Sequence, residues 1–300
     1  MTDKVTGEGK TTISIGIADL DNILGGGLTA NRAYLLEGTP GSGKTTIALQ
    51  FLLEGARQGE RGLYITLSET SGELKEVARS HDWALDDIDL FELVSGEGLD
   101  PETEQSILEP SEVELGETIQ GVMECVDRIR PVRVVFDSLS EMRLLAQNSL
   151  RYRRQILALK QYFSLRNCTV LMLDDRSSDP NDLQLHSIAH GVITLEQAAQ
   201  EYGTERRRLR VVKMRGVKYR GGYHDFVIET GGVAVFPRLV ASEHRSHYVE
   251  HLVSTGLDPL DRMLGGGVSI GTNLLFNGPS GVGKTTTAVQ FGLSAIARGE

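Results

Sequence analysis

The sequence predicts an α/β fold in which helices flank a mostly parallel central sheet, and three observations support this prediction. A glycine-rich phosphate-binding loop lies between a short apolar run and a segment with helical spacing. Strand-like and helix-like segments alternate along most of the chain, which is typical of a parallel sheet. The loop recurs 240 residues later, which predicts a duplicated domain.

The first loop has the pattern G-x-x-x-x-G-K-[ST] and lies between the apolar run 33–37 and the helical pattern of residues 46–56. Glycines let backbone N–H groups approach phosphate closely, and the N-terminus of a helix favours an anion. We therefore predict an ATP site with Mg²⁺, in which Lys44 reaches the β- and γ-phosphates and Thr45 binds the metal. The alternative, a surface turn, requires lysine, hydroxyl and flanking elements to coincide by chance. The predicted ATP contacts are Gly38, Thr39, Pro40, Gly41, Ser42, Gly43, Lys44, Thr45 and Thr46.

The second loop begins at Gly278, and the same offset relates Asp21 to Asp261 and Gly25 to Gly265. A gapless repeat of this length predicts tandem copies of one domain. The given sequence reaches only the first helix of the second copy, so we expect a truncated second domain. The ATP contacts predicted there are Gly278, Pro279, Ser280, Gly281, Val282, Gly283, Lys284, Thr285 and Thr286, with Thr285 as a metal ligand. The predicted boundaries are a tail at 1–13, a first ATPase domain at 14–237, a linker at 238–253 and the start of a second domain at 254–300.

Composition limits the classes of function. A net charge of −10 opposes nucleic-acid binding by the surface as a whole, although it leaves room for a local basic stripe. No apolar run approaches the roughly 20 residues of a membrane span, and the first residues lack the apolar core of a signal peptide. Cys125 and Cys168 are expected to be buried thiols in a reduced compartment, which favours the cytoplasm.

The elements expected along the chain follow hydrophobic spacing and turn signals. Residues 95–117 contain eight carboxylates and no lysine or arginine, so we expect a solvated, mobile insertion there. In order, we expect a short helix ended by glycines at 20–28, a strand at 61–69, a helix at 72–80, a strand at 89–94, a helix near 116–130, a strand at 132–138, a helix at 149–165 and a strand at 169–174.

The last stretch of the first domain has a different character. Short strands at 191–196, 206–214, 226–229 and 233–236 are separated by turn signals, which predicts an antiparallel extension of the sheet. Residues 237–255 are polar and are expected to connect the two copies.

Three carboxylates fall at the ends of predicted strands, on the edge where such sheets bind ligands. Asp137 fits the residue that orients Mg²⁺ in phosphate-loop ATPases, the alternative being a cap for the next helix. Glu69 is a candidate general base for the attacking water, or else a surface carboxylate that opens a helix. Asp174 is a candidate sensor of nucleotide state, or part of a charged turn with Asp175 and Arg176.

Residues 205–220 contain eight basic side chains against one acid. This stripe is a nucleic-acid surface, a solvated face, or a cationic edge presented to a neighbouring subunit's nucleotide. His186 and His190 have the spacing of a zinc pair, but no third ligand stands out, so we expect ordinary helical packing. The basic residues are Arg206, Arg207, Arg208, Arg210, Lys213, Arg215, Lys218 and Arg220.

Taken together, these motifs resemble the KaiC family of RecA-like ATPases, which carry two tandem domains. The matching segments are Leu-Gly-Gly-Gly at 24–27, the loop at 38–45, Leu-Ser-Glu-Thr at 67–70, Ala-Arg-Ser-His-Asp-Trp at 78–83, Val-Val-Phe-Asp-Ser at 134–138 and Lys-Met-Arg-Gly at 213–216.

The resemblance implies a RecA-like fold and a hexameric ring with ATP bound between subunits. Lys213 and Arg215, with Met214 between them, match the segment that reaches the neighbour's nucleotide, and Ser80 matches a position lining the nucleotide pocket. The family's clock members carry paired glutamates where this chain has Ser68 followed by Glu69. This departure puts the hydrolysis rate and a clock role in doubt and leaves ATP binding untouched.

From this we expect a ring-forming, Mg-ATP-dependent ATPase that acts as a signalling or timing switch with protein partners. A serine/threonine autokinase activity would belong to the second domain. The alternative is a recombinase-like, DNA-binding accessory ATPase. The basic stripe separates the two, because it would face the subunit interface in one case and a central pore in the other.

Overall fold

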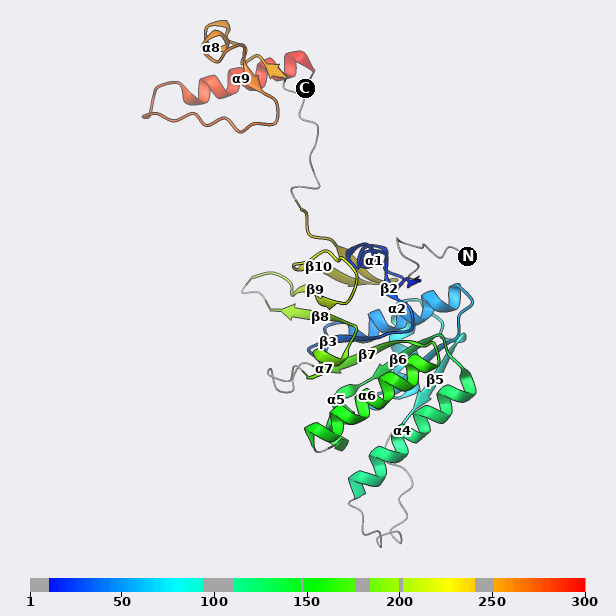
Figure 1. The fold of residues 1–300 in the computed structure, drawn as a ribbon. Coiled ribbons are helices and arrows are strands. Elements are labelled where there is room, and N and C mark those ends of the chain that lie inside the picture. Colours follow the sequence, from blue (N-terminus) through cyan, green and yellow to red (C-terminus); the bar gives the residue numbers. More distant parts are fainter. Residues whose placement is uncertain are drawn as a thin grey trace. The chain divides into compact units, whose positions relative to one another are not determined.

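A computed structural model describes residues 11–93, 110–146, 148–175, 184–199, 202–240 and 251–299. The chain divides into two compact units, 1–238 and 239–300. Figure 1 shows the elements of both units. The first unit contains β1 (Thr12–Ile13), α1 (Ala18–Ile23), β2 (Leu28–Thr29), β3 (Ala33–Gly38), α2 (Lys44–Arg57), β4 (Gly62–Thr66), α3 (Ser71–Ser80), β5 (Ile88–Glu92), α4 (Pro110–Ile129), β6 (Arg133–Asp137), α5 (Leu139–Ala146), α6 (Ser149–Leu165), β7 (Thr169–Asp175), α7 (Gln184–Ile188), β8 (Gly191–Ala198), β9 (Arg206–Met214), β10 (His224–Glu229) and β11 (Gly232–Phe236).

Nine strands form the central sheet in the order β11-β10-β9-β8-β3-β7-β6-β4-β5. The strands from β8 to β5 pair in parallel, whereas β9, β10 and β11 are antiparallel to their neighbours. The mostly parallel sheet with an antiparallel extension is therefore confirmed. The prediction was wrong for residues 191–196, because β8 runs parallel to β3 and the antiparallel part begins at β9. Helix α7 between β7 and β8 is the crossover that parallel pairing requires.

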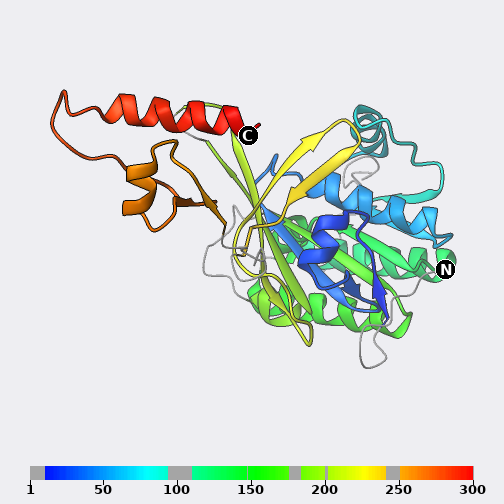
Figure 2. The ribbon, with the colours of Figure 1, turned by 90° about the horizontal axis from the view of Figure 1, so that it is seen from above.

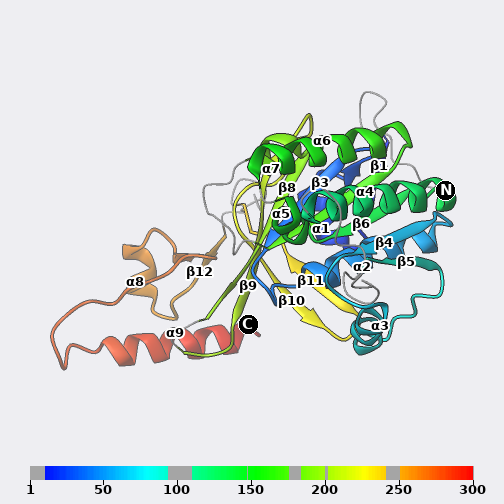
Figure 3. The same ribbon diagram turned by 90° about the horizontal axis from the view of Figure 1, so that it is seen from below.

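Helices cover both faces of this sheet, as Figures 2 and 3 show. Helices α1, α2 and α3 bury their apolar residues in one core, together with the sheet residues on that face, such as Tyr34 and Leu36. Helices α4, α5, α6 and α7 pack into a second core on the opposite face, with Leu35 and Phe136. Because side chains alternate along a strand, neighbouring residues of β3 contribute to different cores.

Several predicted boundaries shift. Residues 12 and 13, assigned to the tail, form β1 and pair with β2, since the Ile13 side chain is buried in the first core. Helix α5 was missed because it begins two residues after the strand β6, with no linker to signal it. Helix α4 begins at Pro110, inside the predicted insertion, whose residues 95–109 lie outside the described residues. Helix α6 was predicted with its bounds.

The second unit contains β12 (Leu252–Val253), α8 (Asp258–Met263), β13 (Val268–Ser269) and α9 (Lys284–Arg298). Strand β12 falls within the predicted linker, yet it pairs with β13 as β1 pairs with β2. Asp261 accepts hydrogen bonds from Ser254 and Thr255, as Asp21 does from Ser14 and Ile15. The sequence repeat is therefore also a repeat of local structure. Within the described residues of both units, no helix has the length and apolar content needed to cross a bilayer.

Candidate nucleotide-binding site

The first phosphate loop connects the buried strand β3 to the N-terminus of α2. Every residue of β3 is buried, and α2 begins at Lys44 directly after Gly43. Gly41 and Gly43 have φ angles of 77° and 100°, which residues with a β-carbon adopt at a cost. A β-carbon at Gly43 would also lie 2.7 Å from the Ile228 side chain. The free N–H groups of a 14-residue helix thus meet an open glycine turn, which suits an anion.

Lys44 lies at the centre of this loop and is 8% exposed. Its Nζ donates to the carbonyls of Gly38 at 3.0 Å and Thr39 at 3.2 Å. The same Nζ lies 2.7 Å from Oδ1 of Asp175 at the end of β7. The ammonium group is therefore held at the loop by two carbonyls and one carboxylate, and a phosphate entering the loop would compete with Asp175 for it.

Asp137 lies beside this lysine at the end of β6. Its Oδ2 accepts a hydrogen bond of 2.5 Å from the buried Tyr64 hydroxyl, which also contacts the Thr45 side chain. Burial raises the pKa of Asp137, although the Tyr64 hydrogen bond and the Lys44 charge oppose that shift. Burial and the Asp137 charge raise the pKa of Tyr64 well above its usual value. The negative charge of Asp137 is therefore buried, and a cation there would stabilise it. Tyr64 links this carboxylate to Thr45, the loop residue predicted to bind a metal.

Glu69 follows β4 and completes the group. Its backbone N–H donates to the Thr66 hydroxyl at 2.9 Å, and the same hydroxyl donates back to the Glu69 carbonyl at 2.7 Å, which fixes this turn. One carboxylate oxygen, Oε2, is buried without a hydrogen-bond partner among the described residues. Burial, followed by the charge of Asp137, raises the pKa of Glu69. A buried acceptor without a partner favours a polar ligand or water at this position.

The sequence did not decide the role of Asp174, and the structure separates it from its neighbour. Asp174 is a buried residue of β7, not part of a turn, and accepts from Ser140 at 3.0 Å and from Arg143 at 3.1 Å. Burial raises its pKa in spite of the Arg143 charge. Asp175, one residue later, is the one that reaches Lys44. Arg176 lies outside the described residues.

Sequence reasoning missed two residues of the site, Tyr64 and Asp175, and the buried carboxylate of Glu37, which directly precedes the loop. Tyr64 reads as an ordinary apolar residue in a strand, so no signal marked it. Glu37 was a candidate that could have been found, since a carboxylate inside a buried strand directly before the loop needs partners. Its oxygens accept from Thr194 at 2.8 Å and contact His186 Nε2 at 2.8 Å.

The two histidine rings of the predicted pair have different partners. His186 bonds Glu37, whereas the His190 ring packs edge-on against Tyr34 at a centroid distance of 5.6 Å. Among the described residues, no group of three or more histidine, cysteine or acidic side chains is arranged to hold a metal ion. The prediction of helical packing fits His186 in α7, whereas His190 lies two residues beyond the end of that helix.

The residues carried over from the family resemblance lie apart from the loop. Lys213 Nζ donates to the carbonyl of Ala189 at 2.9 Å and to that of His186, and Arg215 Nη2 donates to the carbonyl of Ser187 at 2.8 Å. These carbonyls belong to α7 and the residue after it, on the face opposite α2. Met214, between them, is buried in the core with α2.

Ser80 is the last residue of α3, and its side chain is exposed. Its hydroxyl donates to the carbonyl of Val77 at 2.7 Å, so it bonds within its own helix. None of the described contacts of Ser80 reaches the phosphate loop, and its assignment to the nucleotide pocket stays a prediction.

The basic stripe is partly neutralised along β9. Arg206 pairs with Asp225 at 2.7 Å, and Arg208 pairs with Glu196 at 2.9 Å. The Arg208 guanidinium also stacks on the Tyr223 ring at 4.1 Å. These pairs leave less free positive charge for a nucleic-acid backbone than the count of basic residues implies.

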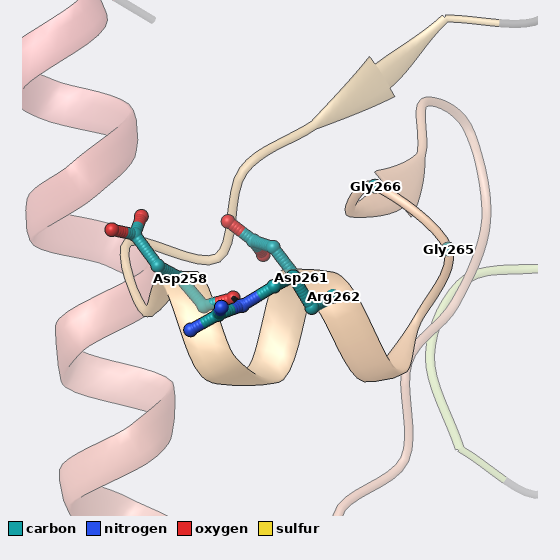
Figure 4. Close-up of a pocket in the computed structure, with 5 residues that line it drawn as sticks. All are labelled: Asp258, Asp261, Arg262, Gly265 and Gly266. Atoms are coloured by element: carbon teal, nitrogen blue, oxygen red, sulfur yellow. Dashed lines mark hydrogen bonds between the residues drawn. The ribbon is translucent and has the colours of Figure 1, made fainter.

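The second loop reproduces the local contacts of the first. Lys284 Nζ donates to the carbonyls of Gly278 at 2.8 Å and Pro279 at 2.7 Å. Figure 4 shows a separate hollow in this unit, lined by residues of α8 and by the glycines that follow it. Asp261 in that hollow already caps the preceding turn, so the hollow repeats a structural motif and is distinct from the phosphate loop. It is lined by Asp258, Asp261, Arg262, Gly265 and Gly266.

Comparison with known proteins shows which family the chain resembles. A family model described as the KaiC ATPase matches residues 13–240. The chain is 28% identical to the circadian clock protein KaiC3 of Synechocystis sp. over 100% of its own length and 60% of that protein. It is 29% identical to the circadian clock oscillator protein KaiC of Synechococcus elongatus, with 95% and 55% covered. The chain thus spans little more than half of these curated relatives.

A solved structure supports the same fold. The crystal structure of a KaiC-like protein from the archaeon Pyrococcus horikoshii matches with a TM-score of 0.64, covering 76% of this chain and 100% of that one, at 23% identity. The RecA-like architecture expected from the sequence is therefore confirmed. With the family model matching most of the chain, the chain belongs to the KaiC family of ATPases.

Proposed function

We propose that the chain binds Mg-ATP at its first phosphate loop and hydrolyses it slowly in a hexameric ring. The observation that carries this proposal is the arrangement of Lys44, Asp137 and Glu69 around the N-terminus of α2. A cation, a metal-orienting carboxylate and a candidate base meet there, as phosphoryl transfer requires.

The side chains present fit both ATP and Mg²⁺. Buried polar atoms at the loop, Oγ of Ser42 and Oε2 of Glu69, lack partners among the described residues, which suits a polar ligand. Thr45 and Asp137 offer the oxygen atoms that Mg²⁺ prefers. When bound, the metal would neutralise phosphate charge. The chain's own residues orient the phosphates through α2 and Lys44, and Glu69 accepts a proton from water.

The position of a second set of cations supports the proposal of ring assembly. Lys213 and Arg215 bond to α7 on the sheet face opposite α2, so in this arrangement they point away from their own loop. We propose that they act on the nucleotide of a neighbouring subunit. The names of the curated relatives refer to the circadian clock, and we extend this to a timing or signalling switch with protein partners, with autokinase activity as a role for the second domain.

A mixing experiment tests the trans role. Arg215→Ala subunits should bind ATP yet turn over slowly in rings. They should regain turnover when mixed with Lys44→Ala subunits, which keep Arg215 but have a defective loop. All subunits carry Lys284→Ala so that the second loop does not contribute. Mixed rings demonstrated by mass, but without recovered turnover, would count against trans action.

The DNA-binding alternative makes a different prediction. Phosphate contacts weaken steeply with salt, so single-stranded DNA binding should fall strongly between low and moderate salt if the stripe on β9 holds DNA. The ion pairs of Arg206 and Arg208 oppose this role, and we expect no specific binding.

A further inference from the structure

Four cationic side chains gather where α7 ends. Lys160, from α6, donates its Nζ to the carbonyl of Ile188 at 2.6 Å, beside the carbonyls that Lys213 and Arg215 use. Arg32 directly precedes Ala33, whose carbonyl accepts from the backbone N–H of His190 at 2.8 Å, and the His190 carbonyl accepts from the backbone N–H of Arg215 at 3.1 Å. Three different parts of the fold, at residues 32, 160 and 213–215, thus bring positive charge to one place.

Neutralising the C-terminus of α7 accounts for only part of the positive charge of these four side chains. The C-terminus of a helix carries roughly half a negative charge, which is much less than the positive charge assembled around it. In the part of the chain that the structure describes, none of these four side chains forms a salt bridge with a carboxylate, whereas Arg206 and Arg208 on the same strand as Lys213 do.

The cations also act on one another. Burial, followed by the charge of Arg215, lowers the pKa of Lys160. Burial and the charges of Arg215 and Lys160 lower the pKa of Lys213. Repulsion of this kind is relieved when an anion enters the cluster. Arg32 and Arg215 are exposed while Lys160 and Lys213 lie half-buried beside them, so the cluster is open to a ligand.

The anion does not come from the chain's own loop. Helix α7 and Lys160 pack on one face of the sheet, whereas the phosphate loop leads into α2 on the other. The register also places Lys213 beside Val192, near the start of β3, whereas the loop follows the last residue of β3. A phosphate group bound at the first loop of a second copy is not subject to this separation, because it belongs to another chain.

We propose that Lys160 and Arg32 complete, with Lys213 and Arg215, a four-cation site for the triphosphate of a nucleotide bound to a neighbouring copy of this chain. This inference rests on the proposed ring and adds two residues that no motif marks. Lys160 also positions α7, because its hydrogen bond to the Ile188 carbonyl holds the end of that helix in place. The trans contact predicts an effect on the neighbour's turnover that a purely structural bond would not produce.

The test uses the full chain with Lys284→Ala in every variant. Lys160→Gln keeps a hydrogen-bond donor and removes the charge, and we expect kcat/KM for ATP in rings to fall about tenfold. Arg32→Gln should act in the same direction, and Lys160→Arg should restore most of the rate. Arg154→Gln, an exposed residue on the same helix, is the matched control and should leave the rate unchanged.

Mixing separates the trans site from a local role. Lys160→Gln subunits have an intact loop, so Lys44→Ala partners that keep Lys160 should restore turnover per intact loop. Proven mixed rings without recovery, or wild-type turnover in Lys160→Gln rings, would overturn the inference while leaving the proposed function intact. Loss of salt-sensitive single-stranded DNA binding without loss of turnover would also overturn it. A wild-type chain that neither binds ATP nor assembles with it would instead overturn the proposed function, and the inference with it.

Discussion

Lys44 and Lys284 occupy equivalent positions in the two phosphate loops, and each donates hydrogen bonds to two loop carbonyls. Gly43 and Gly283 directly precede the following helices and have φ angles of 100° and 90°. What differs is the surroundings. Lys44 has the carboxylates of Asp175, Asp137 and Glu69 near it, whereas no carboxylate contacts Lys284 among the described residues of the second unit.

The apolar residues before the loops differ in the same way. Tyr34 and Leu35 are 0% and 2% exposed, while their equivalents Leu274 and Leu275 are 42% and 86% exposed. In the first unit β3 is paired on both sides, whereas residues 273–277, directly before the second loop, form no strand. The two loops therefore share their lysine contacts, although the described residues of the second unit include no counterpart of the strands that surround the first loop. The carboxylates proposed to act there, by contrast, come from the ends of strands distant in the sequence.

The largest expected effect comes from removing the candidate base. Glu69→Gln keeps the shape and removes the proton acceptor, so steady-state ATPase activity should fall about 10²- to 10⁴-fold while ATP binding persists. Ser68→Ala, at the exposed neighbouring residue, is the control and should retain the rate. Unchanged turnover in purified Glu69→Gln rings would remove Glu69 from this role.

The same residue predicts a pH dependence. A base acts when deprotonated, and burial with the nearby Asp137 charge raises the pKa of Glu69. Activity should therefore decline on acidification at a higher pH than an ordinary glutamate would give. In the pH profile of kcat/KM, an acid limb at the pKa of an unperturbed carboxyl group, about 4.3, would contradict this assignment.

An intermediate effect is expected at Tyr64. Tyr64→Phe removes the hydroxyl that donates to Asp137 at 2.5 Å and leaves that carboxylate without its main partner. We expect the Mg²⁺ concentration for half-maximal ATPase activity to change by about tenfold, since a hydrogen bond to a charged group contributes roughly 1.5–3 kcal/mol. Tyr223→Phe, at the ring on which Arg208 stacks, serves as the control. An unchanged Mg²⁺ requirement would separate Tyr64 from the metal site.

The smallest effect is expected at Asp175. Asp175→Asn removes the carboxylate that holds Lys44 at 2.7 Å, so a nucleotide no longer competes with it. ATP affinity should rise by up to about fivefold, as expected for a partly exposed ion pair. Asp89→Asn breaks an exposed pair with Arg61 and should leave affinity unchanged. Weaker ATP binding in Asp175→Asn would show that Asp175 helps to hold the nucleotide.

The features that the sequence predicted correctly are mostly those that depend on neighbouring residues in the chain. The glycine loop, the helix α6 and the strand ending in Asp137 depend on neighbouring residues, and the structure places them as expected. The direction of β8 and the contact of Asp175 with Lys44 depend on which strands pair. The spacing of apolar residues along the chain does not encode that pairing. Tyr64 was missed for the same reason. Its hydroxyl reaches Asp137 only because β4 and β6 are neighbours in the sheet.

The central claim is that the first loop, set in its sheet, is the nucleotide site. Equilibrium binding of ATP to the full chain tests this most directly, with Lys44→Ala and Lys284→Ala compared as single variants. Lys284→Ala should bind ATP as the parent chain does, and Lys44→Ala should lose about 10- to 100-fold in affinity. Equal affinity in the two variants, or loss only in Lys284→Ala, would contradict the claim.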